Sequence, residues 1–459
     1  MVPNLSLASG KVWVSEKTPA ERRTTVGKKI PVVTVAEPAE AARLAGLPLE
    51  ATVAMADVAG AIKDGLLAFA SATGLVVMFK MMEAELAERI GPKHAKIPSR
   101  EGNWHGSTTG SVVLGGRRVT AERPRGRSTD GGEIALDTWA VFSNEDLLTQ
   151  VVVERMLAGV PTRRHADVAE PLGPELEGRS KAISRSAVSR RFRRATEKAL
   201  AELMARDLSD LDVAVVMIDG IEVAGSCLVA ALVITTDGKK IPVGLYLGDT
   251  ENKTVVTDLL ADLVARGLSV EGGLLVVIDG AKALAAGVRK VFGDHALVQR
   301  CTLHKRRNVA SYLPKEAAER VDRRLAMAFH HPDPAKGLAR AKAIAAELDG
   351  DHPDAAASLR EGLEDMFTVR RLGVSGRLAK TLTNTNCIES MISVARTVMR
   401  NVKRWKDGPM KKRWVATGML EAERSFRRVK GCKEMPLLVA ALRRHVGSVR
   451  GTEYDKEAA

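Results

Sequence analysis

Two apolar segments that end in almost the same phrase constrain the fold of this chain most. The segments DVAVVMIDG and GLLVVIDG each carry one acid, Asp219 and Asp279, directly after a continuous apolar run. An apolar run of this length without alternation is typical of a strand that is buried on both faces. Such strands need helices on both sides of their sheet. The sequence therefore predicts an α/β fold in which two buried strands end in a carboxylate.

The neighbouring segments complete the expected sheet. Residues 227–248 contain two β-like runs around Asp237-Gly238, a dipeptide that is a strong hairpin signal. Helical patterns at 251–267 and 281–293 then alternate with the second strand and with a short apolar run at 295–300. The expected divisions are a sheet-bearing segment at 206–300, a helical segment without strands at 301–380 and a basic helical remainder at 381–459.

The chain before residue 206 has three differently composed parts. Residues 1–55 are rich in Pro, Glu and Ala, and we expect a leader of low order there. Residues 56–141 begin with a helix-prone stretch and continue with short β-like runs among many Gly, Arg and Ser residues. That module is either a small basic β-rich domain or a DNA-contacting arm, and its composition does not decide between them.

Residues 142–205 have the layout of a helix-turn-helix DNA-binding domain. Ser143 and Asp146 resemble a capping pair at the start of one helix, Gly159 and Pro161 end it, and a last helix begins near Ser184. In such a layout the first turns of the last helix meet base edges and phosphates. The candidate DNA contacts are Ser186, Ser189, Arg190, Arg191 and Arg194. An ordinary exposed basic helix is the alternative.

The charge balance indicates a polyanionic partner. The 459 residues include 70 Lys and Arg against 56 Asp and Glu, a net charge of +14, and this favours nucleic acid or an anionic membrane surface. Between residues 396 and 433 there are 13 Lys and Arg against 3 Asp and Glu, so the excess is concentrated there. No apolar run approaches ~18 residues, and residues 1–30 hold no apolar core, so we expect neither a spanning helix nor a secretory signal.

The four cysteines argue against a disulfide or zinc scaffold. Cys227, Cys301, Cys387 and Cys432 are far apart and form no CxxC pair. This usage fits a reducing compartment. We therefore expect a cytoplasmic, nucleoid-associated protein with no membrane partner.

A third acid, Glu389, completes a possible metal site. Residues 384–386 form a turn-and-cap stretch, and Glu389 lies in the first turn of the helix that follows, beside its apolar face. Three carboxylates at one site can hold two Mg²⁺ or Mn²⁺ ions about 4 Å apart for phosphoryl transfer. A first-turn Glu that only favours the helix dipole is the alternative.

Two other chemistries of a strand-end Asp do not fit. A dehalogenase-type phosphatase needs a second Asp two residues on, yet Ile221 and Ala281 occupy those positions. No GxxxxGK[ST] loop accompanies either strand, which excludes a P-loop nucleotide site of the usual kind.

Together these motifs resemble the Mutator-type bacterial insertion-sequence transposases. The resemblance lies in the acids Asp219, Asp279 and Glu389 and in the phrases VVMIDG, VVIDGAKAL, QRCTLHKRRNV, TNCIES and TVMRNVKRWKDG, and it covers about residues 143–445. It implies an RNase H-like catalytic core, interrupted by an α-helical insertion between the second and third acids.

The resemblance also singles out Cys301, His304 and Trp405. Two residues are too few for a zinc site, so a structural or DNA-positioning role is favoured for the Cys-x-x-His pair. If the segment is helical, Arg300, His304 and Asn308 share a face that could meet DNA phosphate or buttress the acids. Trp405 either stacks on an unpaired base or packs in the core. The candidate DNA contacts in this half of the chain are His304, Lys305, Arg400, Lys403, Arg404, Trp405, Lys411 and Lys412.

The hypothesis from sequence is a Mg²⁺-dependent DNA transposase, a polynucleotidyl transferase. It would bind terminal inverted repeats and target DNA as double strands and act as a homodimer or larger assembly, because two ends must be brought together. An RNase H-like nuclease or resolvase would share the acids but would not join strands. A sequence-specific DNA-binding regulator would use the helix-turn-helix without catalysis.

Overall fold

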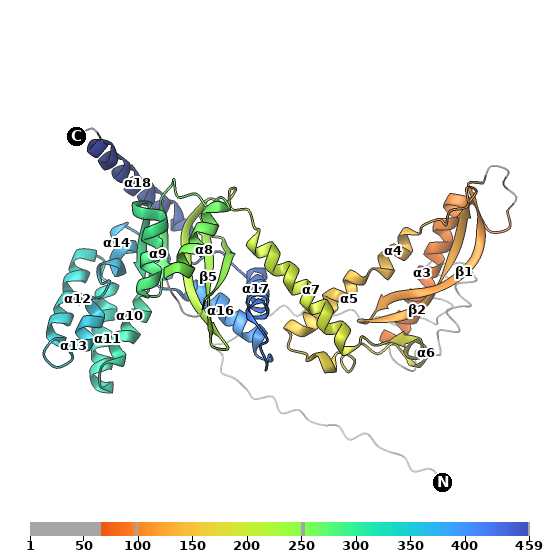
Figure 1. Cartoon of the computed structure of the whole chain (residues 1–459), viewed down its shortest axis with the longest axis horizontal. Coiled ribbons are helices and arrows are strands. Elements are labelled where there is room, and N and C mark those ends of the chain that lie inside the picture. The colour runs from red at the N-terminus through yellow and green to blue at the C-terminus, as the bar shows by residue number, and fades with distance from the viewer. Residues whose placement is uncertain (1–65, 96, 98–99, 249–252, 458–459) are drawn as a thin grey trace, which may run out of the picture. The chain divides into compact units, whose positions relative to one another are not determined.

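The structure is a computed structural model that describes residues 66–457, apart from 96, 98–99 and 249–252 (Figure 1). The predicted leader at 1–55 lies outside these residues. The chain divides into two compact units after Met78. The described part of the first unit is the beginning of helix α3 (Leu66–Ile90). All the elements below belong to the second unit.

A long antiparallel hairpin dominates the N-terminal part of this unit. Strands β1 (Gly102–Leu114) and β2 (Arg117–Ser128) pair over most of their length, and the two-residue strand β3 (Ser180–Lys181) adds to β2. The turn consists of Gly115 and Gly116, both with positive φ, a conformation that favours glycine. The β-like runs predicted in this segment are therefore one sheet.

The predicted helices between residues 142 and 205 are present, with a different first cap. Asn144 caps α5 (Glu145–Leu157) by accepting from the Asp146 amide at 2.8 Å, whereas Ser143 ends the preceding α4 (Asp137–Ser143). The capping pair predicted at Ser143 is wrong by one residue. Ser184 caps α7 (Arg185–Met204), as predicted, and two short helices, η2 (Thr162–Arg164) and α6 (Pro174–Gly178), lie between.

A five-stranded mixed sheet forms the centre of the unit. Its order is β6-β5-β4-β7-β8. Strands β4 (Val213–Val223), β5 (Ser226–Thr235) and β6 (Lys240–Gly248) follow one another along the chain, and each is antiparallel to the next. Strands β7 (Leu274–Ile278) and β8 (Ala296–Arg300) continue the sheet in parallel with β4. The hairpin predicted at Asp237-Gly238 connects β5 and β6, so that prediction is confirmed.

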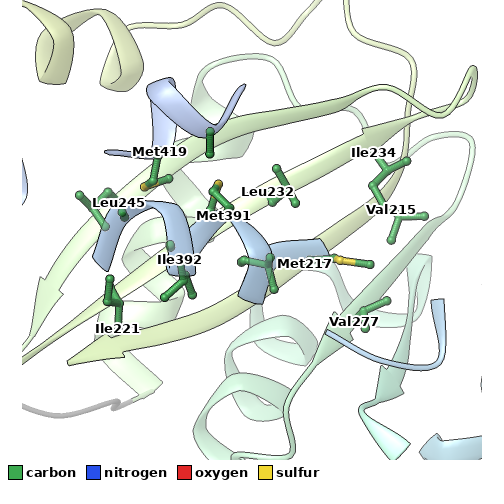
Figure 2. Packing of buried hydrophobic residues seen from close by; sticks show 14 of the residues in the cluster. Val215, Met217, Ile221, Leu232, Ile234, Leu245, Val277, Met391, Ile392 and Met419 are labelled. Carbon is green, nitrogen blue, oxygen red and sulfur yellow. The ribbon is translucent and has the colours of Figure 1, made fainter. Parts of the chain in front are cut away.

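Helices cover both faces of this sheet because its strands are apolar on both faces. One face packs on α8 (Lys253–Ala265) and α9 (Lys282–Phe292). The other packs on α16 (Asn386–Met399) and α17 (Gly408–Arg424), where Met391 and Met419 lie over Met217 and Leu245 (Figure 2). Each such side chain stabilises the fold by roughly 1.5–3 kcal/mol on burial. The α/β class predicted from the apolar runs is confirmed.

A separate helical layer connects β8 to α16 and has its own apolar core around Phe329 and Phe367 (Figure 1). No described residue between Cys301 and Lys380 belongs to a strand, as predicted. Its helices are α10 (Thr302–Ser311), α11 (Lys315–Phe329), α12 (Pro334–Leu348), α13 (Pro353–Arg360), η4 (Glu364–Phe367), α14 (Thr368–Arg371) and α15 (Gly376–Leu382).

The basic stretch predicted as one long helical region is broken. Helix α16 ends at Met399, and α17 begins only at Gly408, after an irregular segment. Asp407 accepts from the Met410 amide at 2.7 Å and Pro409 occupies the first turn, so the phrase DGPM starts a new helix. The chain then continues through η5 (Cys432–Glu434) to α18 (Met435–Glu457). None of the helices described here is long and apolar enough to span a membrane.

Candidate active site

Asp219 and Asp279 lie side by side on adjacent parallel strands. Ile218 of β4 is opposite Ile278 of β7, so the acids that follow them are at the same level of the sheet. Asp279 directly follows β7, as predicted. Asp219 does not end its strand, because the hairpin with β5 extends β4 to Val223. The prediction of a strand end is therefore wrong for Asp219, although the two acids meet as expected.

The surroundings of the Asp219 carboxyl disfavour its ionised form. It is only 9% exposed, and its main partner is the Gly220 amide, which donates to Oδ1 at 2.9 Å. Burial, followed by the charges of Asp279 and Glu389, raises the pKa of Asp219 to about 7, while the Gly220 amide and His304 oppose that rise. Acids that disfavour each other's ionisation in this way form a site that a divalent cation would stabilise.

Helix α16 delivers Glu389 to the same place. The helix packs on β4 through Ile388, Met391 and Ile392, which are among the apolar positions predicted for it. Glu389 is in its first turn, and the Thr385 hydroxyl donates to Glu389 Oε1 at 2.5 Å. The charge of Glu389 contributes to the raised pKa of Asp219, which indicates that the two carboxyls are near each other.

Cys301 and His304 surround Glu389 from the other side. Cys301 follows β8, its amide donates to the Ile278 carbonyl at 2.8 Å, and it caps α10. The Thr385 Oγ1 lies 3.4 Å from both Cys301 Sγ and His304 Nδ1, and His304 Nδ1 is 3.9 Å from Glu389 Oε1. The hydrogen bond with Cys301, together with Glu389 and Asp219, raises the pKa of His304 to about 9. His304 therefore carries its positive charge beside Glu389.

Among the described residues, one group of side chains around Glu389 has the spacing of a metal site. The ligand atoms of Cys301, His304 and Glu389 all lie within 4.8 Å of one another. A thiol and an imidazole suit zinc, which usually takes four protein ligands in a structural site. The three carboxylates supply only oxygen, the ligand that Mg²⁺ and Mn²⁺ prefer. The all-oxygen set fits the predicted cofactor.

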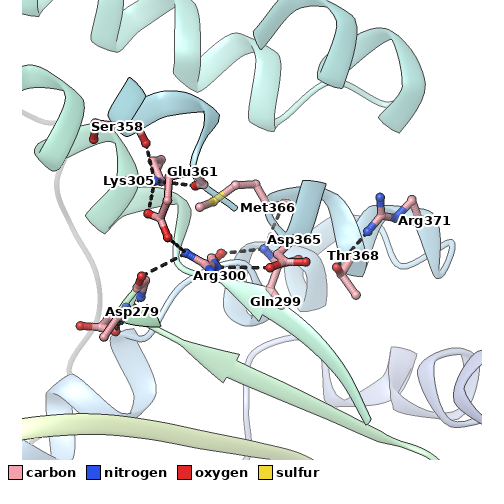
Figure 3. Close-up of polar contacts among 12 residues, drawn as sticks. Asp279, Gln299, Arg300, Lys305, Ser358, Glu361, Asp365, Met366, Thr368 and Arg371 are labelled. Atoms are coloured by element: carbon pink, nitrogen blue, oxygen red, sulfur yellow. Dashed lines mark hydrogen bonds and ion pairs between the residues drawn. The ribbon is translucent and has the colours of Figure 1, made fainter. Parts of the chain in front are cut away.

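Buried ion pairs tie the helical layer to the loop after Asp279 (Figure 3). Arg300, at the end of β8, donates from Nη1 to the Gly280 carbonyl at 3.1 Å and to Glu361 at 2.6 Å, and from Nε to Asp365 at 3.2 Å. Gly280 and Ala281 in turn donate their amides to Asp279 Oδ1. Arg300 thus positions an acid. The sequence suggested that it shares a helical face with His304 and Asn308, but Arg300 ends β8 and lies before α10.

Lys305 is part of the same network and is not available to DNA. Its side chain is 3% exposed, and Nζ donates to the carbonyls of Ser358 and Glu361 at 2.6 and 2.8 Å and to Glu361 Oε2 at 3.2 Å. A phosphate contact would have to break these bonds in a buried position. Predicting Lys305 as a DNA contact was wrong, because the pattern of α10 does not reveal the helix that covers it.

The candidate contacts on α7 divide into exposed and paired residues. Ser186, Ser189, Arg190 and Arg194 are exposed. Arg191 instead donates to Glu145 at 2.7 Å and to Thr149 at 3.0 Å, so it holds α5 against α7. The three arginines border a cavity of about 460 Å³ together with Arg118 of β2 and Lys181 of β3.

The candidate contacts near α17 are similarly divided. Arg400, Lys403 and Arg404 are exposed in the segment between α16 and α17, whereas Trp405 is half-buried against the core. Lys411 donates to the Ala224 carbonyl at 3.0 Å and to Ser226 Oγ at 2.8 Å, and so fastens α17 to the β4–β5 turn. Lys412 is half-buried. Sequence reasoning missed the role of Thr385, which only the polar phrase TNTN marked.

Comparison with known proteins places this chain in a family. The family described as "Transposase, Mutator family" matches residues 49–426, and the chain belongs to that family.

Two curated proteins are similar over shorter lengths. A probable insertion-sequence transposase of Corynebacterium diphtheriae is 26% identical over 218 residues, which are 47% of this chain and 62% of that protein. The transposase for insertion sequence element IST2 of Acidithiobacillus ferrooxidans is 36% identical over 89 residues, 19% of this chain and 29% of that protein. The matched part of the chain thus spans less than two thirds of either relative.

Proposed function

We propose that this protein is an insertion-sequence DNA transposase that cuts the ends of its element and joins them to new DNA in a divalent-metal-dependent reaction. The observation that carries the proposal is that Asp219 and Asp279 lie side by side, with Glu389 near enough to raise the pKa of Asp219, in a chain of the Mutator family. The strand order, with three antiparallel strands followed by two parallel ones, supports an RNase H-like core.

Asp219, Asp279 and Glu389 are the residues that would hold Mg²⁺ or Mn²⁺. Bound there, two ions would lower the pKa of the attacking hydroxyl and neutralise charge on the leaving oxygen. The protein's own part is to fix the three carboxylates: β4 and β7 set the first two in register, Thr385 orients Glu389, and the Gly280 and Ala281 amides orient Asp279. The positive charge on His304 beside Glu389 would favour a phosphate nearby.

The helices of residues 142–205 are proposed to bind the terminal inverted repeats as a helix-turn-helix domain. The exposed residues of the first turns of α7, Ser186, Ser189 and Arg190, are placed as base and phosphate contacts of such a domain would be. Arg194 would bind phosphate, while Arg191 maintains the angle between α5 and α7. A homodimer or larger assembly would bring two ends together.

The test is cleavage and binding of DNA that carries the element's end. Asp219→Asn, Asp279→Asn and Glu389→Gln should each lower Mg²⁺-dependent nicking by at least about 100-fold, because a lost metal ligand removes several kcal/mol of transition-state stabilisation. End binding in a mobility-shift assay should stay within about twofold of the unchanged protein. Asp258→Asn, an exposed acid on α8, is the matched control. Normal nicking by any of the three variants would refute the assignment.

Two alternatives make different predictions in the same assays. An RNase H-like nuclease would nick but would not join pre-cut ends to a target plasmid. A DNA-binding regulator would bind the end in EDTA and in Mg²⁺ alike, without nicking.

A further inference from the structure

A second basic cavity lies next to the helix that carries Glu389. It has a volume of about 880 Å³ and is bordered by the end of α15, the start of α16, the first residue of β6 and the segment after α17. Asn386 and Ser390 of α16 line it, one helical turn apart. Thr385 and Glu389, also one turn apart, face Cys301 and His304 instead. The start of α16 is therefore a wall between the three acids and this cavity.

The cavity is lined by cations and by no carboxylate. Six basic residues from distant parts of the chain border it, namely Lys240, Arg377, Lys380, Arg427, Arg428 and Lys430. Two of the six have a partner: Arg428 donates to Asp237 at 3.1 Å, and the Lys240 ammonium lies 4.5 Å from the centre of the Phe426 ring.

The other four cations are not neutralised by the protein. Within the described part of the chain, no acid lies within ion-pairing distance of Arg377, Lys380, Arg427 or Lys430, and all four are exposed. Their convergence costs electrostatic free energy unless an anion with several charges binds among them. A nucleic-acid backbone supplies such charges at a regular spacing.

The lining indicates contacts to backbone and not to bases. Besides the cations it offers the Ser390 hydroxyl and the Asn386 amide, which are common phosphate contacts, and its lining includes no aromatic ring on which a base could stack. Binding through phosphates alone carries no sequence information. The partner is then DNA that is held whatever its sequence.

We propose that this cavity holds the phosphate backbone of the target duplex, the DNA to which the element's ends are joined. The proposal rests on the function proposed above. An α-helix with its side chains is about 10 Å across. One strand of DNA carries a phosphate about every 3.4 Å along its axis. A target strand in the cavity could thus reach the acids beyond the adjacent face of α16 within roughly three phosphates.

The experiment neutralises three of the cations together. The variant Arg377→Gln/Arg427→Gln/Lys430→Gln removes side chains that have no protein partner among the described residues, so it should fold normally. Arg289→Gln/Lys290→Gln/Arg323→Gln is the control, since it removes the same charge from exposed positions on α9 and α11. Both are compared with the unchanged protein in binding a repeat-free 30-base-pair duplex, end nicking, and joining of pre-cut ends to a plasmid.

The cavity variant should lose at least tenfold in strand joining and in binding of the repeat-free duplex. The slope of log K against log salt for that binding should become shallower by about 2 to 3, because each of the three lost phosphate contacts contributes about 0.9 to the slope. End binding and end nicking should stay within about twofold.

Three outcomes would count against the proposal or separate it from the wider function. An unchanged salt slope with unchanged joining would overturn it. An equal loss of nicking and joining would also overturn it, because it would show that the cavity binds the element's own DNA. If the unchanged protein neither nicks nor joins, the proposed function fails. The target assignment then fails with it, while the duplex-binding measurement still tests the cavity as a phosphate site.

Discussion

The carboxyl of Asp219 is buried beside two other acids, and this placement determines how the metal-free protein responds to pH. Its pKa is about 7 in the folded chain, against about 3.9 in an unfolded one. Between these values the folded state binds a proton that the unfolded state does not bind. The stabilisation from this proton is therefore complete below about pH 4 and is lost as the pH rises through about 7.

Asp219→Asn should remove that loss. In EDTA at pH 8 the variant should unfold at a higher temperature than the unchanged protein, by an amount worth up to about 4 kcal/mol, since each pKa unit corresponds to 1.36 kcal/mol. The difference should shrink steadily as the pH is lowered to 5. Thermal unfolding followed by circular dichroism measures it, with Asp258→Asn as the control. A variant that is no more stable than the unchanged protein at either pH value would contradict the electrostatic account.

Thr385 is the residue that orients the third acid. Thr385→Val removes the hydroxyl that donates to Glu389 and leaves a side chain of nearly the same shape. Without that bond the carboxylate is free to rotate, so nicking should fall by about tenfold, equivalent to about 1.4 kcal/mol. Thr385→Ser keeps the hydroxyl and should restore most of the rate, and end binding should be unchanged in both. Equal rates for Val and Ser would show that the hydroxyl has no positioning role.

At the scale of elements, Arg300 connects the helical layer to the loop after Asp279. Arg300 binds Glu361 and Asp365 of that layer and the Gly280 carbonyl next to Asp279. The arginine is 7% exposed, but its acidic partners are 33% and 22% exposed, so solvent weakens the pairs. The layer is therefore a support for the active-site loop, in addition to having a core of its own.

Arg300→Gln should destabilise the protein and disturb Asp279 together. We expect a loss of about 2–3 kcal/mol in the free energy of unfolding, toward the lower end for a broken buried pair because the acids are partly hydrated. Nicking should fall even at temperatures where the variant is fully folded. Arg324→Gln breaks an exposed pair with Glu347 and should cost less than about 1 kcal/mol with normal nicking. If both variants behave alike in urea unfolding and in nicking, Arg300 has no special role.

The elements themselves were largely predictable from sequence, and their terminations and partners were not. Continuous apolar runs identified β4 and β7, and the 3.6-residue spacing identified α16 with Glu389 in its first turn. Asp219 was wrongly placed at a strand end because the length of β4 depends on its pairing with β5. Lys305 was wrongly placed at the surface because only the tertiary fold brings Glu361 over it. Burial of a charged residue requires a partner that local patterns do not specify.

At the scale of the whole molecule, the excess of basic residues serves different purposes in different places. Arg400, Lys403 and Arg404 are exposed, whereas Lys411 is bound to the β4–β5 turn. Net charge alone treats these residues as equivalent. The structure separates cations that are free to meet DNA from cations that hold the fold together.

That separation predicts opposite behaviour for neighbouring basic residues. Lys403→Gln/Arg404→Gln should weaken DNA binding and lower the salt slope by up to about 2, at about 0.9 per phosphate contact, with little change in stability. Lys411→Gln should instead lower the free energy of unfolding by about 1 kcal/mol through its two lost hydrogen bonds, and leave the slope almost unchanged. Fluorescence anisotropy across a salt series and urea unfolding measure the two effects. A slope that depends only on the number of charges removed would refute the distinction.

The order of the three acids along the chain has a consequence for synthesis. Asp219 and Asp279 leave the ribosome early, but the helical layer from Thr302 to Leu382 must follow before α16 brings Glu389 to them. Until then the sheet has an uncovered apolar face and only two of its three carboxylates. A nascent or truncated chain ending before Asn386 would therefore retain α5 and α7 but could not complete the acid site. If α5 and α7 bind the element's ends as proposed, such a product would occupy those ends without cutting them and would compete with the full-length protein.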